Sequence, residues 1–250
     1  MTRINALLVC GGKYHDMDFA RVELLKLLAE HERIRVRVAE DYGNVAALRA
    51  ADFLVTYTCD VLPSEAEQEE LHRFLERSGH WFALHGTNSV LRFVKGKGWD
   101  APRTSQRCMQ MLGSQFVAHP PIQPYRVTVA DPSHPLVRDV EPFDADDELY
   151  LCEYHGANHA LLETRFSGSA PGFVAHDWST DERRLVMYLH EHGGGRVLYL
   201  TLGHCRGHYD MQPMLDYYAS VERGSWNLPV FYQLLRRGVR WAAKLDIQGH

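Results

Sequence analysis

The sequence predicts an α/β fold with a mostly parallel central sheet, because short apolar runs alternate with longer helical patterns through the first half of the chain. Glycine- or histidine-containing turns directly follow several of these runs, as expected where parallel strands end. A β-rich excursion from about 120 to 195 interrupts the alternation. We expect a single domain over residues 1–250.

The strands predicted for the parallel sheet are four early apolar runs and one late run, at 4–10, 34–39, 53–57, 81–84 and 196–202. A helix is expected from about Asp18 to His31, since its leucines recur on one face. Another helix is expected after Ser64, which suits an N-cap with acidic residues in the first turn. The closing helix is predicted over 226–244, with its aromatic and aliphatic residues facing inward.

The excursion contains four short apolar patterns that predict strands or hairpins beside the parallel sheet, at 125–131, 146–154, 159–166 and 183–192. Ahead of it, the glycine- and lysine-rich segment 94–103 is typical of an active-site loop.

Composition and charge exclude several classes of protein. The chain has 27 Lys and Arg against 32 Asp and Glu, and this net charge of −5 argues against a nucleic-acid partner. A hydrophobic content of 45% argues against disorder. No apolar run approaches the roughly 20 residues of a membrane span. Five single cysteines, without a CxxC pair or a secretory segment after Met1, predict a cytoplasmic protein.

Histidine is abundant, with 15 copies, and three of them follow predicted strands. His15 lies in the turn after the first strand, His85 directly after the fourth, and His204 after the late strand. Because the loops at the carboxyl ends of parallel strands converge, we expect these three side chains to share one site. Imidazole titrates near neutrality and binds metal ions, so acid/base or metal chemistry is expected there.

The acidic segment 146–150 contributes a further candidate. If it is a strand, Glu148 and Tyr150 share one face and could present a base and a hydroxyl donor to the same cavity. Asp146 and Asp147 are expected to form a solvated acidic edge. His119, which begins a Pro-rich loop, and the alternating pair His190 and His192 are not assigned to the site; their sequence contexts favour structural roles.

Two other chemistries are weakly supported. Gly11 and Gly12 lack the third glycine of a dinucleotide fingerprint, and no P-loop pattern occurs. A nucleophile elbow at 84–86 would place His85 where a nucleophile belongs, and no GxSxG pattern occurs. The cysteines near strand ends, Cys10, Cys59 and Cys205, are better explained as small buried hydrophobes.

Several short motifs carry a resemblance to a known family: GGKYH at 11–15, FALHG at 82–86, DDELY at 146–150, GGGRVLYLTLGH at 193–204 and GVRWAA at 238–243. With them the chain resembles the ThuA-like (trehalose utilisation) family over most of its length. The resemblance implies a fold related to that of class I glutamine amidotransferases, and hence a flavodoxin-like three-layer sandwich. Those relatives have a cysteine where this chain has His85, so glutaminase activity is not expected.

The resemblance also implies a role in carbohydrate use, since the founding member works beside an oxidoreductase that makes 3-keto disaccharides. We therefore expect a lyase or hydrolase that acts on a 3-keto sugar by acid/base chemistry, with a sugar oxidoreductase as functional partner. The candidate catalytic residues are His15, His85, Glu148 and His204, with Glu148 or His85 as the base. The candidate substrate-binding residues are Tyr14, Asn88, Trp99 and Tyr150.

A divalent metal such as Zn²⁺ is a candidate cofactor, with His15, His85 and His204 as ligands and Glu148 as an oxygen donor. Two alternatives stay open: a non-catalytic sugar-binding or regulatory protein, and an enzyme acting on a different small carbonyl compound. The aromatic segment 209–226 is a candidate surface for a second copy of the chain.

Overall fold

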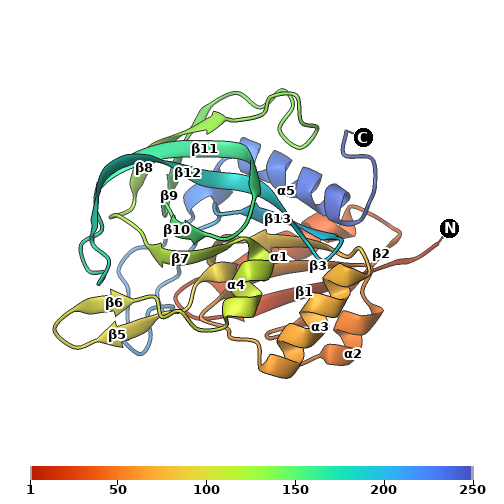
Figure 1. Ribbon diagram of the computed structural model, residues 1–250, viewed down its shortest axis with the longest axis horizontal. Helices are drawn as coiled ribbons and strands as arrows, with labels where there is room; N and C mark the ends of the chain where they lie inside the picture. Colours follow the sequence, from red (N-terminus) through yellow and green to blue (C-terminus); the bar gives the residue numbers. More distant parts are fainter. Residues whose placement is uncertain (1, 249–250) are drawn as a thin grey trace.

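Nine strands form one continuous sheet in the computed structural model, which describes residues 2–248 (Figure 1). One half of this sheet is parallel, in the order β2 (Ile34–Ala39), β1 (Ile4–Gly12), β3 (Phe53–Cys59), β4 (His80–Leu84) and β13 (Gly195–Leu200). Every residue of β3 is buried, as expected for a parallel strand covered on both faces. The late apolar run thus returns to the parallel sheet as predicted.

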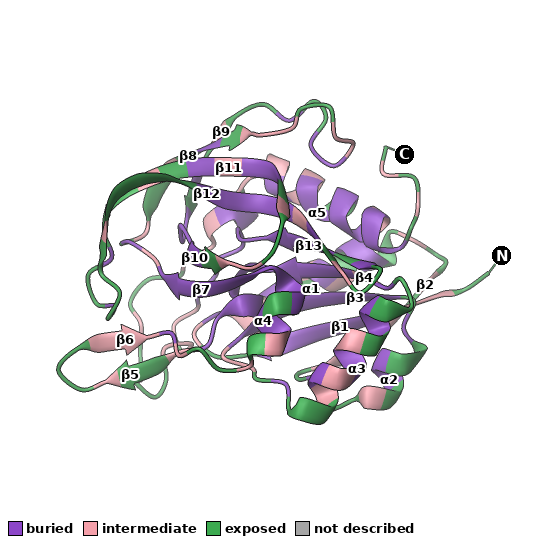
Figure 2. Cartoon of the chain, in the orientation of Figure 1, coloured by how far each residue is buried: buried purple, intermediate pink, exposed green. Residues whose placement is uncertain are grey.

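The excursion continues the same sheet with antiparallel strands, in the order β12 (Asp177–His192), β11 (Asn158–Ser169), β8 (Gln123–Val129) and β9 (Phe143–Asp147). The prediction of a mostly parallel sheet therefore holds for only one half. The reason is the tight turn at Gly193 and Gly194, whose positive φ angles reverse the chain so that β12 runs against β13. The last residues of β11 and the first residues of β12 are exposed and curl away from the core (Figure 2).

Helices cover both faces of the sheet (Figure 1). On one face, α1 (Met17–Ala29) and α5 (Pro229–Ala242) pack a core that includes Leu24, Phe231 and Leu8. On the other face lie α2 (Val45–Ala50), α3 (Glu65–Glu76) and α4 (Gln106–Leu112), around Leu48, Phe74 and Leu112. Alternate residues of β1 point into the two cores, because successive side chains of a strand face opposite ways.

Helix boundaries agree with their sequence signals to within a few residues. Ser64 caps α3 in a capping box with Glu67, as its position predicted. The closing helix begins at Pro229, later than predicted, because a short 3₁₀ helix, Gly224–Asn227, precedes it. None of the helices in the described part of the chain is long and apolar enough to cross a membrane.

Two small sheets flank the large one. β7 (Ser114–Ala118) pairs with β10 (Leu151–Tyr154), and β5 (Arg92–Val94) pairs with β6 (Gly98–Asp100). The segment 94–103, predicted as a loop, thus contains most of a short hairpin that projects beside the carboxyl ends of the parallel strands (Figure 1).

Candidate active site

Three loops at the carboxyl ends of β1, β4 and β13 bring His15, His85 and His204 together. His85 begins a 3₁₀ helix, His85–Asn88, directly after β4, and has a φ of 44°. His204 follows Gly203, whose φ of 128° is strained for any residue with a side chain. All three imidazoles are buried, with 6% of His15, 0% of His85 and 1% of His204 exposed.

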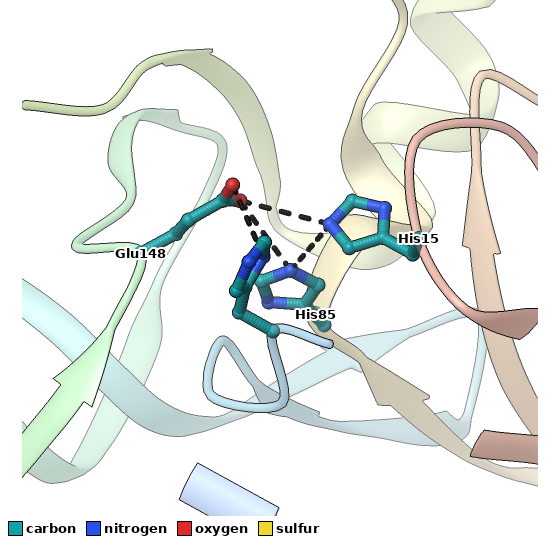
Figure 3. Close-up of side chains that lie close together, drawn as sticks. His15, His85 and Glu148 are labelled. Carbon is teal, nitrogen blue, oxygen red and sulfur yellow. Dashed lines mark hydrogen bonds and ion pairs between the residues drawn. The ribbon is translucent and has the colours of Figure 1, made fainter. Parts of the chain in front are cut away.

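Glu148 completes the cluster from the antiparallel side of the molecule (Figure 3). Its Oε2 atom lies 3.5 Å from Nε2 of His85 and 3.7 Å from Nε2 of His15, and its Oε1 atom lies 3.1 Å from Nδ1 of His204. The two Nε2 atoms of His15 and His85 are 2.9 Å apart. One nitrogen or oxygen atom from each of the four residues thus lies within 4.8 Å of the others, which is the arrangement of a candidate metal-binding set.

Asp147 positions the loop that carries His204. Its carboxylate accepts hydrogen bonds from the backbone N–H groups of Gly203, His204 and Ser225, at 2.9, 3.1 and 3.0 Å. Asp147 is 1% exposed, so the expectation that it belongs to a solvated acidic edge is wrong for this residue, although it fits the exposed Asp146. Its oxygens are turned inward because buried N–H groups need acceptors.

The other ring nitrogen of each imidazole faces an acceptor outside the cluster. Nδ1 of His85 lies 2.7 Å from the Thr201 carbonyl, and Nδ1 of His15 lies 3.2 Å from the Lys13 carbonyl. Nε2 of His204 lies 2.7 Å from a Glu222 oxygen. Because a carbonyl can only accept, we infer that both Nδ1 atoms donate. The Nε2 atoms of His15 and His85 then point into the cluster.

Burial and neighbouring charges shift the pKa values of these groups in different directions. Burial lowers the pKa of His15 to about 4, so that ring is neutral at pH 7. Burial also disfavours the charged form of His204, but the Glu148 charge and hydrogen bonds to Glu148 and Glu222 raise its pKa to about 9. For Glu148, burial is outweighed by the nearby His204 and His119, which hold the pKa of the carboxyl well below its ordinary value of 4.5. Glu148 is therefore a buried carboxylate.

A cavity of about 290 Å³ opens onto this cluster. His15, Glu148 and Arg206 contribute its polar lining. Its walls are largely aromatic: Tyr14, Trp99, Phe116, Tyr150 and Phe173. The rings pack on one another, with centroids 5.6 Å apart for Tyr14 and Trp99 and 4.6 Å apart for Phe116 and Tyr150. A small molecule with apolar faces and several hydroxyl groups suits such a lining.

Three of the four candidate substrate-binding residues, Tyr14, Trp99 and Tyr150, line this cavity. Asn88 does not, and its proposed contact with substrate is corrected. Its side chain is fully buried, and its amide donates to the Ser114 hydroxyl at 2.6 Å. The 3₁₀ helix after β4 carries the amide into the protein interior.

Glu148 and Tyr150 reach the cavity by a different route from the one predicted. The segment 146–150 is not one strand, because β9 ends at Asp147 and β10 begins at Leu151. Glu148 and Tyr150 lie in the connection, and both line the cavity. The prediction that Glu148 and Tyr150 share one face of a strand was thus wrong. The strand ends at Asp147, whose side chain turns inward to bind the 203–204 loop.

Sequence reasoning missed three polar residues near the cluster. Nε2 of His119 lies 3.7 Å from Glu148, and a guanidinium nitrogen of Arg206 lies 3.5 Å from it. Glu222 binds both His204 and Arg206. Arg206 stands two residues after His204 in the same loop, a signal that could have found it. His119 and Glu222 are brought in by distant packing and had no such signal.

A comparison with models of known protein families shows which family the chain belongs to. A family model described as ThuA, trehalose utilisation, matches residues 5–220. The chain belongs to the ThuA family. None of the curated proteins compared with it matches.

Solved structures agree with the ThuA assignment in fold. A ThuA-like protein from Parabacteroides merdae has a TM-score of 0.71 at 17% identity, over 100% of this chain and 93% of that chain. A ThuA-like protein from Bacteroides uniformis has a TM-score of 0.61 at 17% identity, over 84% of this chain and 85% of that chain. A β-galactosidase from Rahnella sp. R3 has a TM-score of 0.52 at 13% identity, over 81% of this chain and 29% of that chain.

Proposed function

We propose that this ThuA family protein is an enzyme that acts on a keto-sugar by acid/base chemistry at Glu148. The observation that carries the proposal is a buried, ionised carboxylate surrounded by imidazoles at one end of an aromatic cavity. Water is excluded from this end of the cavity, so the carboxylate can take a proton from an acidified carbon, although the neighbouring histidines that keep it ionised also lower its basicity. Membership of a trehalose-utilisation family supports a carbohydrate as the substrate.

The size and lining of the cavity support a substrate with one sugar ring inside. At about 290 Å³ the cavity lies at the lower end of the range of roughly 300 to 1,000 Å³ for small-molecule sites. Trp99 and Tyr14 offer ring faces on which a pyranose can stack, and Tyr150 offers a hydroxyl group. The second sugar of a disaccharide would extend toward the open side.

In a 3-keto glycoside, the hydrogen on the carbon between the carbonyl and the glycosidic carbon is acidic. Glu148 takes this proton, and the C–H electron pair moves onto the carbonyl oxygen to give an enolate. The Arg206 guanidinium, at the same end of the cavity, stabilises the developing negative charge. When the enolate re-forms the carbonyl, a carbon–carbon double bond forms and the glycosidic C–O bond breaks.

The departing oxygen takes up a proton, which His119 is placed to supply from the cavity wall. The products are an unsaturated keto-sugar and a free alcohol, so no oxidant or reductant is consumed. Glu148 is a better base than His85 here, because His85 is fully buried behind the cluster and is absent from the cavity lining.

An oxidoreductase that makes 3-keto sugars would supply this substrate, and we propose such an enzyme as the functional partner. We also propose the cytoplasm as the compartment, since the five cysteines are all free and buried.

The test is the turnover of 3-keto-trehalose, with trehalose itself as the matched compound that lacks the acidic C–H bond. We expect the wild-type protein to release glucose from the keto-sugar only, and Glu148→Gln to be slower by roughly 10²- to 10⁴-fold. His159→Gln, remote from the cluster, serves as the control and should keep wild-type turnover. If calorimetry detects sugar binding but no keto-sugar is consumed, the protein is a sugar-binding module and the proposal fails.

A further inference from the structure

The four clustered side chains are arranged as a set of ligands whose centre attracts positive charge. With Nδ1 of His15 and of His85 facing backbone carbonyls, their two Nε2 atoms face each other across 2.9 Å. Nδ1 of His204 is buried and lies 3.1 Å from Oε1 of Glu148, and it offers a ligand atom to the same centre once its proton is released to make room for an ion. Glu148 adds a carboxylate oxygen to the same space. Buried nitrogen and carboxylate acceptors brought this close together are costly unless a proton or a cation lies among them.

We propose that His15, His85, His204 and Glu148 hold one divalent transition-metal ion, with Zn²⁺ as the best match. Imidazole nitrogens with one carboxylate suit Zn²⁺ and its neighbours in the first transition row, whereas Mg²⁺ and Ca²⁺ prefer oxygen ligands throughout. The site goes beyond the proposed function, since it would bind an ion whether or not a sugar is turned over.

The spacing of the ligand atoms fits a four-coordinate ion. Zn–N and Zn–O bonds of about 2.0 to 2.1 Å place tetrahedral ligand atoms about 3.3 Å apart. The corresponding distances here are 2.9 Å between His15 and His85, 3.1 Å between His204 and Glu148, 3.5 Å between His85 and Glu148, and 3.7 Å between His15 and Glu148. One ligand atom from each of the four residues lies within 4.8 Å of the others, so the set would contract around an ion, by up to about 1.5 Å across its widest pair.

The surroundings of the ligands also match a metal site. Metal-binding imidazoles usually donate their second N–H to a carbonyl or carboxylate, which fixes the tautomer. Here the acceptors are the Lys13 carbonyl, the Thr201 carbonyl and Glu222. Glu222 is itself held by Arg206 and by the Tyr218 hydroxyl, each at 2.8 Å. The outer contacts thus orient every imidazole toward one point.

An ion at this point would be accessible from the cavity, because His15 and Glu148 form part of its lining. It would lie at the same end of the cavity where the proposed reaction develops negative charge on the carbonyl oxygen. The ion would stabilise that charge beside the Arg206 guanidinium, with Glu148 bound to it through one oxygen and the other oxygen left to take the proton.

The first experiment measures metal content directly. Protein stripped with a chelator is incubated with Zn²⁺ or Co²⁺ and desalted, and we expect about one ion per chain by elemental analysis, as in a mononuclear site. The Co²⁺ form should show the visible absorption of a tetrahedral ion. Less than about a tenth of an ion per chain with either metal, in protein that is folded by circular dichroism, would overturn the proposal.

Variants separate this site from adventitious binding. His85→Ala and His204→Ala should lose the ion, whereas His190→Ala and His192→Ala, on the distant end of β12, should keep it. Glu222→Gln, which leaves all four ligands in place, should weaken affinity by about 10- to 100-fold. Equal metal loss in the ligand variants and the β12 variants would contradict the proposal, as would full retention in all of them.

Failure of the ion site and failure of the proposed function give different results. Zn²⁺ binding without any turnover of 3-keto-trehalose supports the site and overturns the function. Undiminished turnover by protein shown to be metal-free supports the function and overturns the role of the ion as a resident ligand of the active enzyme.

Discussion

Two groups of histidines lie at opposite ends of the sheet and differ in what their ring nitrogens face. His204 follows the carboxyl end of β13, where it meets His15 and His85. The other group adjoins the amino end of β13, where β12 ends in His190 and His192. It lines a cavity of about 870 Å³, which is larger than the cavity at the cluster, with His134, His155, His159, His190 and His192.

Three histidines of the larger cavity each have a hydrogen-bond partner of their own. Nδ1 of His134 accepts from the Leu136 N–H group, Nε2 of His159 lies 3.0 Å from Asp131, and Nδ1 of His190 lies 3.0 Å from the Asn158 side chain. Within the described residues, the metal-ligand geometry is met by the four-residue cluster alone. The region with more histidines and the larger cavity is therefore not the candidate metal site; the convergence of four ligand atoms marks the other region as that site.

The largest expected difference between the regions is in turnover. His15→Gln should reduce turnover of a 3-keto disaccharide by about 10²-fold or more, because it removes a neighbour of Glu148 that also shapes the cluster. His190→Gln should change it by less than about twofold, as for a residue remote from the chemistry. Initial rates at saturating substrate measure both. Similar losses in the two variants would mean that the distinction between the regions is mistaken.

A second prediction concerns the anchor of the cluster. Asp147→Asn should lower the free energy of unfolding by about 2 to 3 kcal/mol, because a neutral amide accepts poorly from the four backbone N–H groups that the carboxylate holds, those of Glu148, Gly203, His204 and Ser225. Asp146→Asn, one residue earlier and exposed, is the matched control and should stay within about 0.5 kcal/mol of wild type. Urea unfolding followed by fluorescence measures the difference.

A smaller effect is expected at the cavity wall. Trp99→Ala should raise KM by about 2- to 12-fold with little change in kcat, since it removes a stacking face worth roughly 0.5 to 1.5 kcal/mol. Phe93→Ala, from the same hairpin but 61% exposed and outside the lining, tests whether hairpin disruption alone is responsible. An equal rise in KM for Phe93→Ala would assign the effect to the hairpin.

The smallest prediction is a pH effect in the distant region. Burial lowers the pKa of His190 from its ordinary 6.5, and this outweighs the opposing contact with the Ala157 carbonyl. The unfolded chain therefore takes up a proton at this residue before the folded one does. Stability should fall as the pH drops below about 6.5 and level off below the folded pKa.

His190→Gln removes this contribution, so its unfolding free energy should fall less steeply than that of wild type between about pH 7.5 and about pH 5. His176→Gln, at an exposed position, is the control. An identical slope for wild type and His190→Gln would contradict the assignment.

Much of the parallel half of the fold was predictable, because its strands are continuous apolar runs and their ends are marked by glycine and histidine. The family was predictable from short motifs, above all from the segment 195–204. The strands of the antiparallel half were predicted, but their position in the main sheet was not. Whether β8 and β11 form a separate layer or extend the main sheet depends on long-range pairing that no local pattern encodes.

The candidate cluster shows the same limit. His15, His85 and His204 were predictable because each follows a parallel strand, and such strand ends meet. Asn88 follows β4 equally closely, but a 3₁₀ helix turns it inward. The approach of His119 to Glu148 is set by packing between segments far apart in the sequence, so spacing alone could not reveal it.

The spread of the cluster along the chain has a consequence for biosynthesis. His15 and His85 leave the ribosome well before His204 and its partner Glu222, because both precede them in the chain by more than about a hundred residues. β13 must also insert between β4 and β12 before the loop carrying His204 can form. A nascent or truncated chain that ends before residue 200 therefore lacks His204 and cannot complete the cluster. Closing contacts so distant in sequence is a late and costly step. The chain therefore gains its complete cluster only when β13 has joined the sheet.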